Sequence, residues 1–201
     1  MSRALEHIAG ETDLLHQQDV KAAVADAYQA IVTGAGEAVV ARLYSEEERR
    51  LLPEGAVRWA LGVGNPVRRA RLRPGETVLD VGSGGGIDSI LAAHLVGPSG
   101  RVIGIDVIEE MLARARANAA AAGVADRCEF LHGEMEAIPL PADSVDAVIS
   151  NGVINLSPRK SRVLAELYRV LRPGGRLAVA DLLVESELPV EVKTNDAAWA
   201  G

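Results

Sequence analysis

The stretch TVLDVGSGGGIDSILAAHLVGPSGRVIGID, residues 77–106, decides the fold. A short apolar run, Val78–Leu79, ends in Asp80 and is followed at once by glycines at 82, 84, 85 and 86. A helix-length segment comes next, and a second apolar run, Val102–Ile105, ends in Asp106. The order strand, glycine-rich turn, helix, strand predicts a βαβ unit whose turn lets a ligand approach the backbone.

Strand-like and helix-like segments alternate along the rest of the chain. The pattern predicts strands at Cys128–Leu131, Ser144–Ser150 and Arg176–Leu183, helices at 108–119 and Pro158–Leu171, and a tight turn at Arg172–Gly175. This alternation predicts the α/β class, with N-terminal helices and a doubly wound, mostly parallel sheet. Ligands of such sheets bind beyond the carboxyl ends of the strands, where the strand order reverses. The residues at these predicted ends are Asp80–Gly86, Asp106, Glu134 and Asn151.

Three regions are expected along the chain. Residues 1–65 form an N-terminal helical segment and candidate lid, residues 66–185 the ligand-binding α/β domain, and residues 186–201 the start of a C-terminal region. Within the first region, residues 1–18 are expected to be disordered or loosely helical, and apolar positions recur at helical spacing over residues 19–31.

Local signals in the candidate lid indicate where its helices begin and end. Ser45, with Glu48 three residues later, matches the capping box of a helix start. Pro53 and Gly55 are expected to end that helix. The Asn65–Pro66 pair disfavours helix and predicts a turn-rich connection.

Composition bounds the kind of protein. A hydrophobic content of 48% is ample for a buried core, and the net charge of −7 argues against a nucleic-acid-binding surface. A single cysteine, Cys128, excludes an internal disulfide and a multi-cysteine metal site, and we expect a buried, inert thiol there. No apolar run reaches the ~18 residues of a membrane span, and the N-terminus lacks the apolar core of a signal peptide. A soluble cytoplasmic protein without a membrane partner is expected.

The glycine-rich turn is compatible with several ligands, and its sequence separates them. A Walker loop is excluded because no Gly-Lys-Ser/Thr follows. A dinucleotide site requires G-x-G-x-x-G/A, but the sixth position counted from Gly82 is Ile87, which resists the close helix–strand packing of that motif. Asp106 follows Gly86 by 20 residues, a spacing that suits a carboxylate accepting both ribose hydroxyls.

A third pattern, D-x-G-x-G-x-G, is met by Asp80, Gly82, Gly84 and Gly86. It resembles the first motif of class I S-adenosylmethionine-dependent methyltransferases. The segments SNGVINL at 150–156 and LRPGG at 171–175 extend the resemblance to motifs after the fourth strand and before the fifth. It implies a Rossmann-like S-adenosylmethionine domain at 66–185, with a cofactor site formed by Asp80, Gly82, Ser83, Gly84, Gly86, Asp106, Val107, Met111, Gly133, Glu134, Met135 and Asn151.

Within this class the chain is most similar to the arsenite methyltransferase family, through ALGVGNP at 60–66, ETVLDVGSGGGID at 76–88, SNGVINLSP at 150–158 and NDAAWAG at 195–201. That family binds trivalent arsenic through cysteine thiolates, soft ligands for a soft centre. Its cysteines correspond here to Val63 and Gly152, and a further one would follow Gly201. We therefore favour methyl transfer to another small molecule. The alternatives are arsenite methylation, a non-catalytic S-adenosylmethionine-binding regulator and, last, an NAD-binding oxidoreductase.

No catalytic residue can be assigned from the sequence. In-line methyl transfer depends mainly on positioning, and a general base is needed only if the acceptor must lose a proton. His132 is the nearest candidate base, although a structural role suits it better, and Asn151 could orient the acceptor or touch the cofactor. Methyltransferases of this class usually add a helix and two strands after the fifth strand. Because 18 residues follow Leu183, we expect an incomplete C-terminal end, an open strand edge and, as one consequence, a homodimer.

Overall fold

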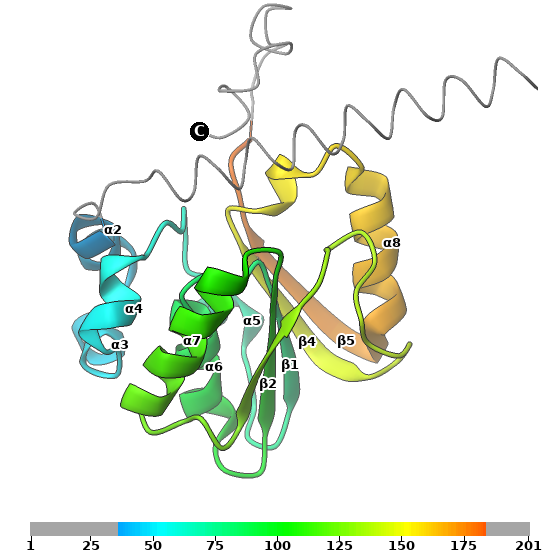
Figure 1. Ribbon diagram of the computed structural model, residues 1–201. Coiled ribbons are helices and arrows are strands. Elements are labelled where there is room, and N and C mark those ends of the chain that lie inside the picture. Colours follow the sequence, from blue (N-terminus) through cyan, green and yellow to red (C-terminus); the bar gives the residue numbers. More distant parts are fainter. Residues whose placement is uncertain (1–35, 184–201) are drawn as a thin grey trace, which may run out of the picture. The chain divides into compact units, whose positions relative to one another are not determined.

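The computed structural model describes residues 36–183, which contain one five-stranded sheet (Figure 1). Its strands are β1 (Thr77–Val81), β2 (Arg101–Asp106), β3 (Cys128–His132), β4 (Val145–Asn151) and β5 (Leu171–Ala180). They follow the order β3-β2-β1-β4-β5, and every neighbouring pair is parallel. The predicted doubly wound parallel sheet is thus confirmed. The strand order reverses between β1 and β4, which places the ligand-binding crevice at the carboxyl ends of these two strands.

Helices cover both faces of the sheet because alternate residues of the central strands are apolar on both sides. Val78 packs in the cluster that contains buried residues of α5 (Pro66–Ala70), α6 (Ile87–Val96) and α7 (Glu109–Ala121). Leu79, the next residue of β1, packs in the opposite cluster, with buried residues of α8 (Lys160–Val170). A short 3₁₀ helix, η1 (Ile154–Leu156), lies between β4 and α8. Figure 1 shows α8 beside β5, on the right, and α7 to the left of β2.

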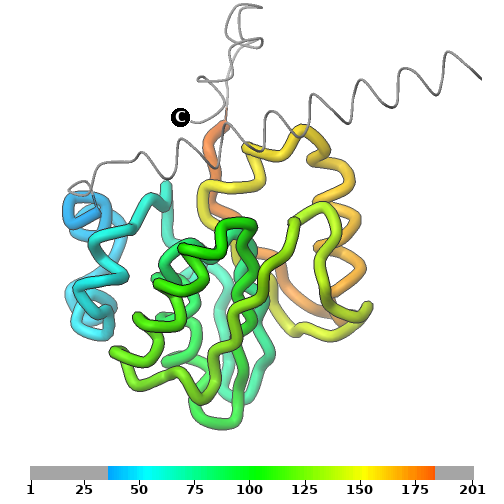
Figure 2. Tube along the Cα trace, viewed as in Figure 1, coloured from blue at the N-terminus to red at the C-terminus, as the bar shows by residue number. Residues whose placement is uncertain are grey.

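Three short helices precede α5: α2 (Gly36–Leu43), α3 (Glu46–Arg50) and α4 (Glu54–Arg58). Val40 of α2 and Ala56 of α4 belong to the same hydrophobic cluster as α6 and α7, and so do Tyr44 and Ala60, which follow these two helices. Helix α3 has no buried residue. Figure 2 shows this blue and cyan part of the chain beside the green part that holds α7. The residues 36–65 of the candidate lid therefore help to build the core.

The local signals in this region were partly right. The capping box is confirmed, because Ser45 Oγ accepts from the Glu48 N–H at 3.3 Å and Ser45 N donates to Glu48 Oε2 at 2.7 Å. The helix ends at Arg50, before Pro53, but the expectation for Gly55 was wrong, since Gly55 lies inside α4. Pro53 precedes α4 as its N-cap, so the proline separates two helices.

The interpretation of Asn65–Pro66 as a helix-disfavouring pair was also wrong. Asn65 is the N-cap of α5, and its side-chain oxygen accepts from Arg68 N at 3.0 Å. Pro66 occupies the first turn, where its missing N–H has no intrahelical partner to lose and its fixed φ suits the helix. The proline therefore keeps only the residue before it, Asn65, out of the helix.

Strand β5 begins and ends earlier than predicted. Leu171 already pairs with Val145, and Arg176 next pairs with Ala147, so the predicted turn Arg172–Gly175 forms an irregularity within the strand. The strand ends at Ala180 rather than Leu183, because its partner β4 ends at Asn151, the residue opposite Ala180.

The expectations for residues 1–35 and 184–201 lie outside the described residues. The three-region division of the chain stays a prediction. Among residues 36–183, no helix is both long enough and apolar enough to span a bilayer.

Candidate functional site

The glycine loop, residues Gly82–Gly86, leaves the carboxyl end of β1 with its N–H groups turned toward the protein. Gly82 N and Ser83 N both donate to the Ile105 carbonyl oxygen at 2.9 Å. Gly84 N donates to Asp106 Oδ2 at 2.9 Å, and Gly86 N donates to Ser83 O at 2.8 Å. Four of the five loop N–H groups are therefore occupied by protein acceptors.

Gly86 forms the junction between this loop and α6. Its φ of +86° favours glycine, and an ideal Cβ would lie 3.1 Å from the Ala115 Cβ of α7. The absence of a side chain lets α7 pack directly against the loop. Inside the loop, the Ser83 hydroxyl is buried and has no hydrogen-bond partner among the described residues. An orphaned buried hydroxyl indicates a place where a ligand would supply a polar atom.

Asp106, at the carboxyl end of β2, is fixed by backbone groups on both sides. Its Oδ2 accepts from Gly84 N, and its Oδ1 accepts from Ile108 N at 2.9 Å. Burial raises the pKa of Asp106, while these backbone N–H groups oppose the rise. Each carboxylate oxygen keeps lone pairs beyond the one used here, so the group can still accept hydrogen bonds from neighbouring hydroxyls.

The predicted adenosine-side residues gather beside Asp106. Gly133 N donates to the Asp106 carbonyl oxygen at 3.0 Å, which places the Gly133–Met135 turn next to the end of β2. Met111 is buried, whereas Val107 is 45% exposed and Glu134 is exposed. The exposed Val107 and Glu134 therefore lie at the surface beside the end of β2.

His132, the candidate base, also lies at this edge of the sheet. Its Nε2 is 3.1 Å from the Val107 carbonyl oxygen. This contact with the backbone supports the structural role that we favoured for it.

Asp80 and Asp88 form a buried pair of carboxyl groups beneath the glycine loop, and we did not predict Asp88. Asp80 is 2% exposed and accepts from Ser89 Oγ at 2.6 Å. Burial and the neighbouring charge of Asp88 raise the pKa of Asp80 to about 8. Burial likewise raises the pKa of Asp88 to about 6. An acid in the first turn of a helix after a glycine loop was the available signal, but its burial depends on tertiary packing.

Tyr44 and Asn151 complete this network from distant parts of the chain. Tyr44 Oη donates to Asp88 Oδ1 at 2.8 Å, and Asn151 Nδ2 donates to Asp88 Oδ2 at 2.9 Å. Burial and the negative charge of Asp88 both raise the pKa of Tyr44, so its hydroxyl remains a donor. Tyr44 was not predicted as a site residue, because nothing in its local sequence distinguishes it.

Asn151 also anchors the loop 61–65, which runs past the end of β4. Its Oδ1 accepts from Val63 N at 2.9 Å and Gly64 N at 3.1 Å, and its Nδ2 donates to Gly64 O at 2.9 Å. The anchored loop brings Val63 close to Gly152, whose ideal Cβ would lie 3.6 Å from a Val63 methyl group. Asn151 is thus engaged with protein groups through both of its amide atoms.

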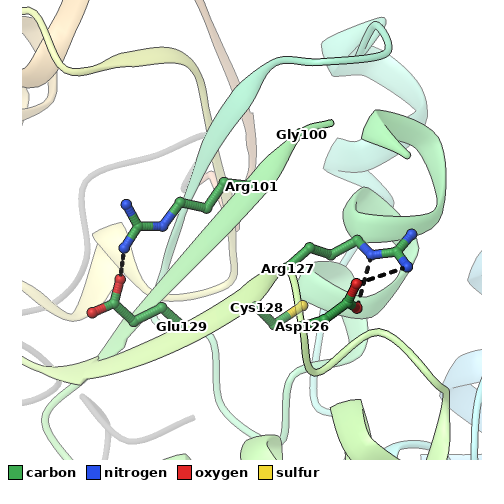
Figure 3. Close-up of a pocket in the computed structure, with 6 residues that line it drawn as sticks. All are labelled: Gly100, Arg101, Asp126, Arg127, Cys128 and Glu129. Carbon is green, nitrogen blue, oxygen red and sulfur yellow. Dashed lines mark hydrogen bonds and ion pairs between the residues drawn. The ribbon is translucent and has the colours of Figure 1, made fainter. Parts of the chain in front are cut away.

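A hollow of about 310 Å³ lies elsewhere, at the amino ends of β2 and β3 (Figure 3). Its charged residues form two ion pairs, Arg101 with Glu129 and Arg127 with Asp126. Cys128 lies between these pairs and is half-buried rather than buried as predicted, because it starts a strand at the sheet edge. Burial raises the pKa of this thiol to about 12, which keeps it protonated and agrees with the inert role expected for it.

The fold and the site together define a Rossmann-like class. A glycine loop after β1, an acid after β2 and a turn after β3 meet at the carboxyl edge of a parallel sheet beside its switch point. This arrangement can hold an adenosine-containing cofactor.

Comparison with known proteins makes the class specific. The model of the family described as "Methyltransferase domain" matches residues 72–201, and the chain belongs to this family. Over 141 residues it is 48% identical to an arsenite methyltransferase of Halobacterium salinarum, an alignment that covers 70% of this chain and 36% of that protein. It is 38% identical over 128 residues to a ubiquinone/menaquinone biosynthesis C-methyltransferase of Marinomonas, covering 63% and 51%.

A solved structure gives the same result. The crystal structure of an arsenic(III) S-adenosylmethionine methyltransferase from Chlamydomonas reinhardtii superposes with a TM-score of 0.62 at 35% identity, covering 85% of this chain and 58% of that one. The predicted resemblance to class I S-adenosylmethionine-dependent methyltransferases is confirmed. The chain spans little more than a third of the length of the curated arsenite methyltransferases that it matches.

Proposed function

We propose that this chain binds S-adenosylmethionine and transfers its methyl group in line to a small-molecule acceptor. The observation that carries the proposal is the inward direction of the loop N–H groups at Gly82, Ser83, Gly84 and Gly86. A loop that cradles phosphate points such groups at the ligand. Here they donate to protein oxygens, so the loop suits a cofactor without phosphate and argues against a dinucleotide.

The residues present fit this cofactor. The Gly82 carbonyl oxygen would accept from its ammonium group, Asp106 would accept from both ribose hydroxyls, and the turn at Glu134 would meet the adenine amine. The orphaned Ser83 hydroxyl offers a further polar contact. Val107, Met111, Gly133 and Met135 would border the adenosine, and Asp80 would support the loop from below. The bound cofactor supplies a methyl group on a positively charged sulfur.

The chain's own contribution to the reaction is positioning. Methyl transfer from a sulfonium is a displacement that needs the acceptor held in line, and orientation alone lowers such a barrier by several kcal/mol. Asn151 acts in this proposal by fixing the loop 61–65 over the crevice, since both of its amide atoms bind protein groups. We assign no general base.

A direct test is isothermal titration with S-adenosylmethionine, S-adenosylhomocysteine and NAD. We expect micromolar or tighter binding of the first two and none of NAD. Binding of NAD, with no response to the other two, would refute the proposal. Binding without turnover of any acceptor would instead favour a regulatory S-adenosylmethionine-binding protein.

Arsenite methylation is the second candidate, favoured by the 48% identity to an arsenite methyltransferase. Against it, the family's cysteine positions hold Val63 and Gly152, which lie beside each other at the crevice without a thiolate between them. An assay for methylated arsenic in excess thiol discriminates the two. We expect no product from this chain, and turnover at the rate of a cysteine-containing relative would make arsenite the acceptor.

We place the protein in the cytoplasm, with a small-molecule acceptor and without nucleic-acid or membrane partners. The acidic net charge of −7 argues against a nucleic-acid partner. We keep a homodimer as a proposal, supported by the apolar side chains Leu177 and Val179 that β5 exposes. Sedimentation of the purified protein would test it.

A further inference from the structure

The Gly85 carbonyl oxygen is held by a side chain from another helix. Asn118 is a buried residue of α7, and its Nδ2 donates to Gly85 O at 2.8 Å. A buried backbone carbonyl needs such a partner, and an amide at this place fixes the direction of the peptide between Gly85 and Gly86. The N–H of that same peptide belongs to Gly86, and it donates to Ser83 O. Asn118 therefore controls the turn that closes the loop.

The other side of the Asn118 amide is packed against α4. An ideal Cβ at Gly55 would lie only 2.3 Å from Asn118 Oδ1, so any side chain there would displace the amide. The amide is confined between the backbone of Gly55 and the carbonyl of Gly85.

Trp59, the C-cap of α4, lies beside the loop. The Cβ of Trp59 is 3.5 Å from the ideal Cβ position of Gly85. The guanidinium of Arg114, also on α7, lies 3.3 Å from the centroid of the Trp59 ring, a cation–π arrangement. The segment 54–59 thus lies beside the loop and packs against the helix that supports it.

We propose that Asn118 is a positioning residue that couples α4 to the cofactor loop, an inference that rests on the proposed binding of S-adenosylmethionine. A shift of α4 at Gly55 moves the Asn118 amide, and the amide moves the Gly85 carbonyl. The helices before the Rossmann-like unit thereby set the shape of the loop and the affinity for the cofactor.

A double-mutant cycle tests the coupling, with the dissociation constant of S-adenosylhomocysteine measured by titration calorimetry. Asn118→Ala and Gly55→Ala are each expected to weaken binding roughly threefold to tenfold, the scale of one lost hydrogen bond. In the Asn118→Ala background there is no amide left to displace, so Gly55→Ala should add no further loss. An equal effect of Gly55→Ala in both backgrounds would overturn the proposal.

A matched control separates loop positioning from general loosening of α7. Arg116 Nη2 donates to the Phe130 carbonyl oxygen at 2.8 Å and so ties the same helix to β3 without contacting the loop. Arg116→Ala should lower the melting temperature but leave the dissociation constant unchanged. A loss of affinity equal to that of Asn118→Ala would show that Asn118 acts only through helix stability.

A measurement without ligand keeps this inference separate from the proposed function. In the free protein, hydrogen exchange of the Gly86 amide should be faster in Asn118→Ala and Gly55→Ala than in the wild type and the Arg116→Ala control. Unchanged exchange in both variants would overturn the inference even if the wild type binds the cofactor. Failure of the wild type to bind, with exchange altered as expected, would refute the proposed function alone.

Discussion

The carboxyl groups at the two ends of the sheet differ in burial and in their hydrogen-bond partners. At the carboxyl end, Asp80 and Asp88 are buried, and their hydrogen-bond donors are the neutral groups of Ser89, Tyr44 and Asn151. At the amino end, the hollow in Figure 3 is lined by acids that are paired with arginines and open to solvent. The hollow at the amino end thus has the ordinary electrostatics of solvated ion pairs.

This difference teaches that the candidate site is distinguished by its buried charge and not by the presence of a hollow. A buried carboxylate without a cation beside it is costly, and such groups persist mainly where function requires them. Solvated ion pairs add little stability and hold no unsatisfied group for a ligand. By this criterion the carboxyl end, with its orphaned Ser83 hydroxyl, is the candidate site.

The largest expected effect is that of Asp80 on how the free energy of unfolding depends on pH. Its folded-state pKa is about 8, above the ordinary value of 3.8, so the folded protein binds an extra proton between these values. This contribution to the free energy of unfolding is present below pH 4 and is lost as the pH rises to about 8. Because one pKa unit corresponds to about 1.4 kcal/mol, the loss amounts to several kcal/mol.

The test is Asp80→Asn, measured by urea denaturation at pH 5 and pH 8. Other acids change the stability with pH in the opposite direction, such as Asp146, whose pKa is lowered by hydrogen bonds from Thr77 N and Arg172. Their contributions are the same in both proteins, so they cancel when the free energy of unfolding of the variant is compared with that of the wild type at each pH. The variant should gain stability relative to the wild type as the pH rises. A difference that is the same at both pH values would mean that Asp80 is ionised without penalty.

A second prediction compares glycines at the two ends. Gly86→Ala combines a φ of +86° with a contact of 3.1 Å to Ala115, and we expect a loss of about 2 to 4 kcal/mol. Gly123, which follows the C-cap of α7, also has a positive φ of +70°, but nothing lies within 4 Å of its ideal Cβ. Gly123→Ala should therefore cost only the backbone strain, about 1 to 2 kcal/mol. Equal losses in denaturation would show that α7 tolerates a side chain at Gly86.

Much of the carboxyl end could be predicted from the sequence because its signals are local. The glycine loop, Asp106 and the turn at Gly133 each follow an apolar strand directly, and parallel strands bring their ends to one edge. The capping box at Ser45 is equally local and was also right.

The residues that hold the loop could not be predicted so readily, because their partners are far away in the chain. Tyr44 binds Asp88, and Asn118 binds Gly85, across 44 and 33 residues respectively. One signal was available for Asn118, which lies three residues after Ala115 on the buried stripe of α7. A polar residue on an apolar stripe indicates a buried hydrogen bond, but its partner requires the tertiary structure.

The third prediction concerns affinity for the cofactor. Asp106→Ala removes the two acceptor oxygens that hold Gly84 N and Ile108 N and would meet the ribose. We expect binding of S-adenosylhomocysteine to weaken by about 1 to 3 kcal/mol. Glu129→Ala, at the hollow, is the matched removal of a carboxylate and should leave this affinity unchanged. Loss of affinity in Glu129→Ala, or none in Asp106→Ala, would reverse the assignment of the two ends.

The smallest effect is expected for the ion pair between Arg101 and Glu129. The side chains of Arg101 and Glu129 are 57% and 41% exposed, so water screens their attraction. Both side chains also lose rotamer freedom when they pair. A double-mutant cycle with Arg101→Ala and Glu129→Ala should give a coupling of about 0.5 kcal/mol or less, decreasing further in 1 M salt. A salt-resistant coupling above about 2 kcal/mol would mean that the hollow is drier than its exposure indicates. The hollow would then resemble the carboxyl end of the sheet, where charged groups are buried away from water.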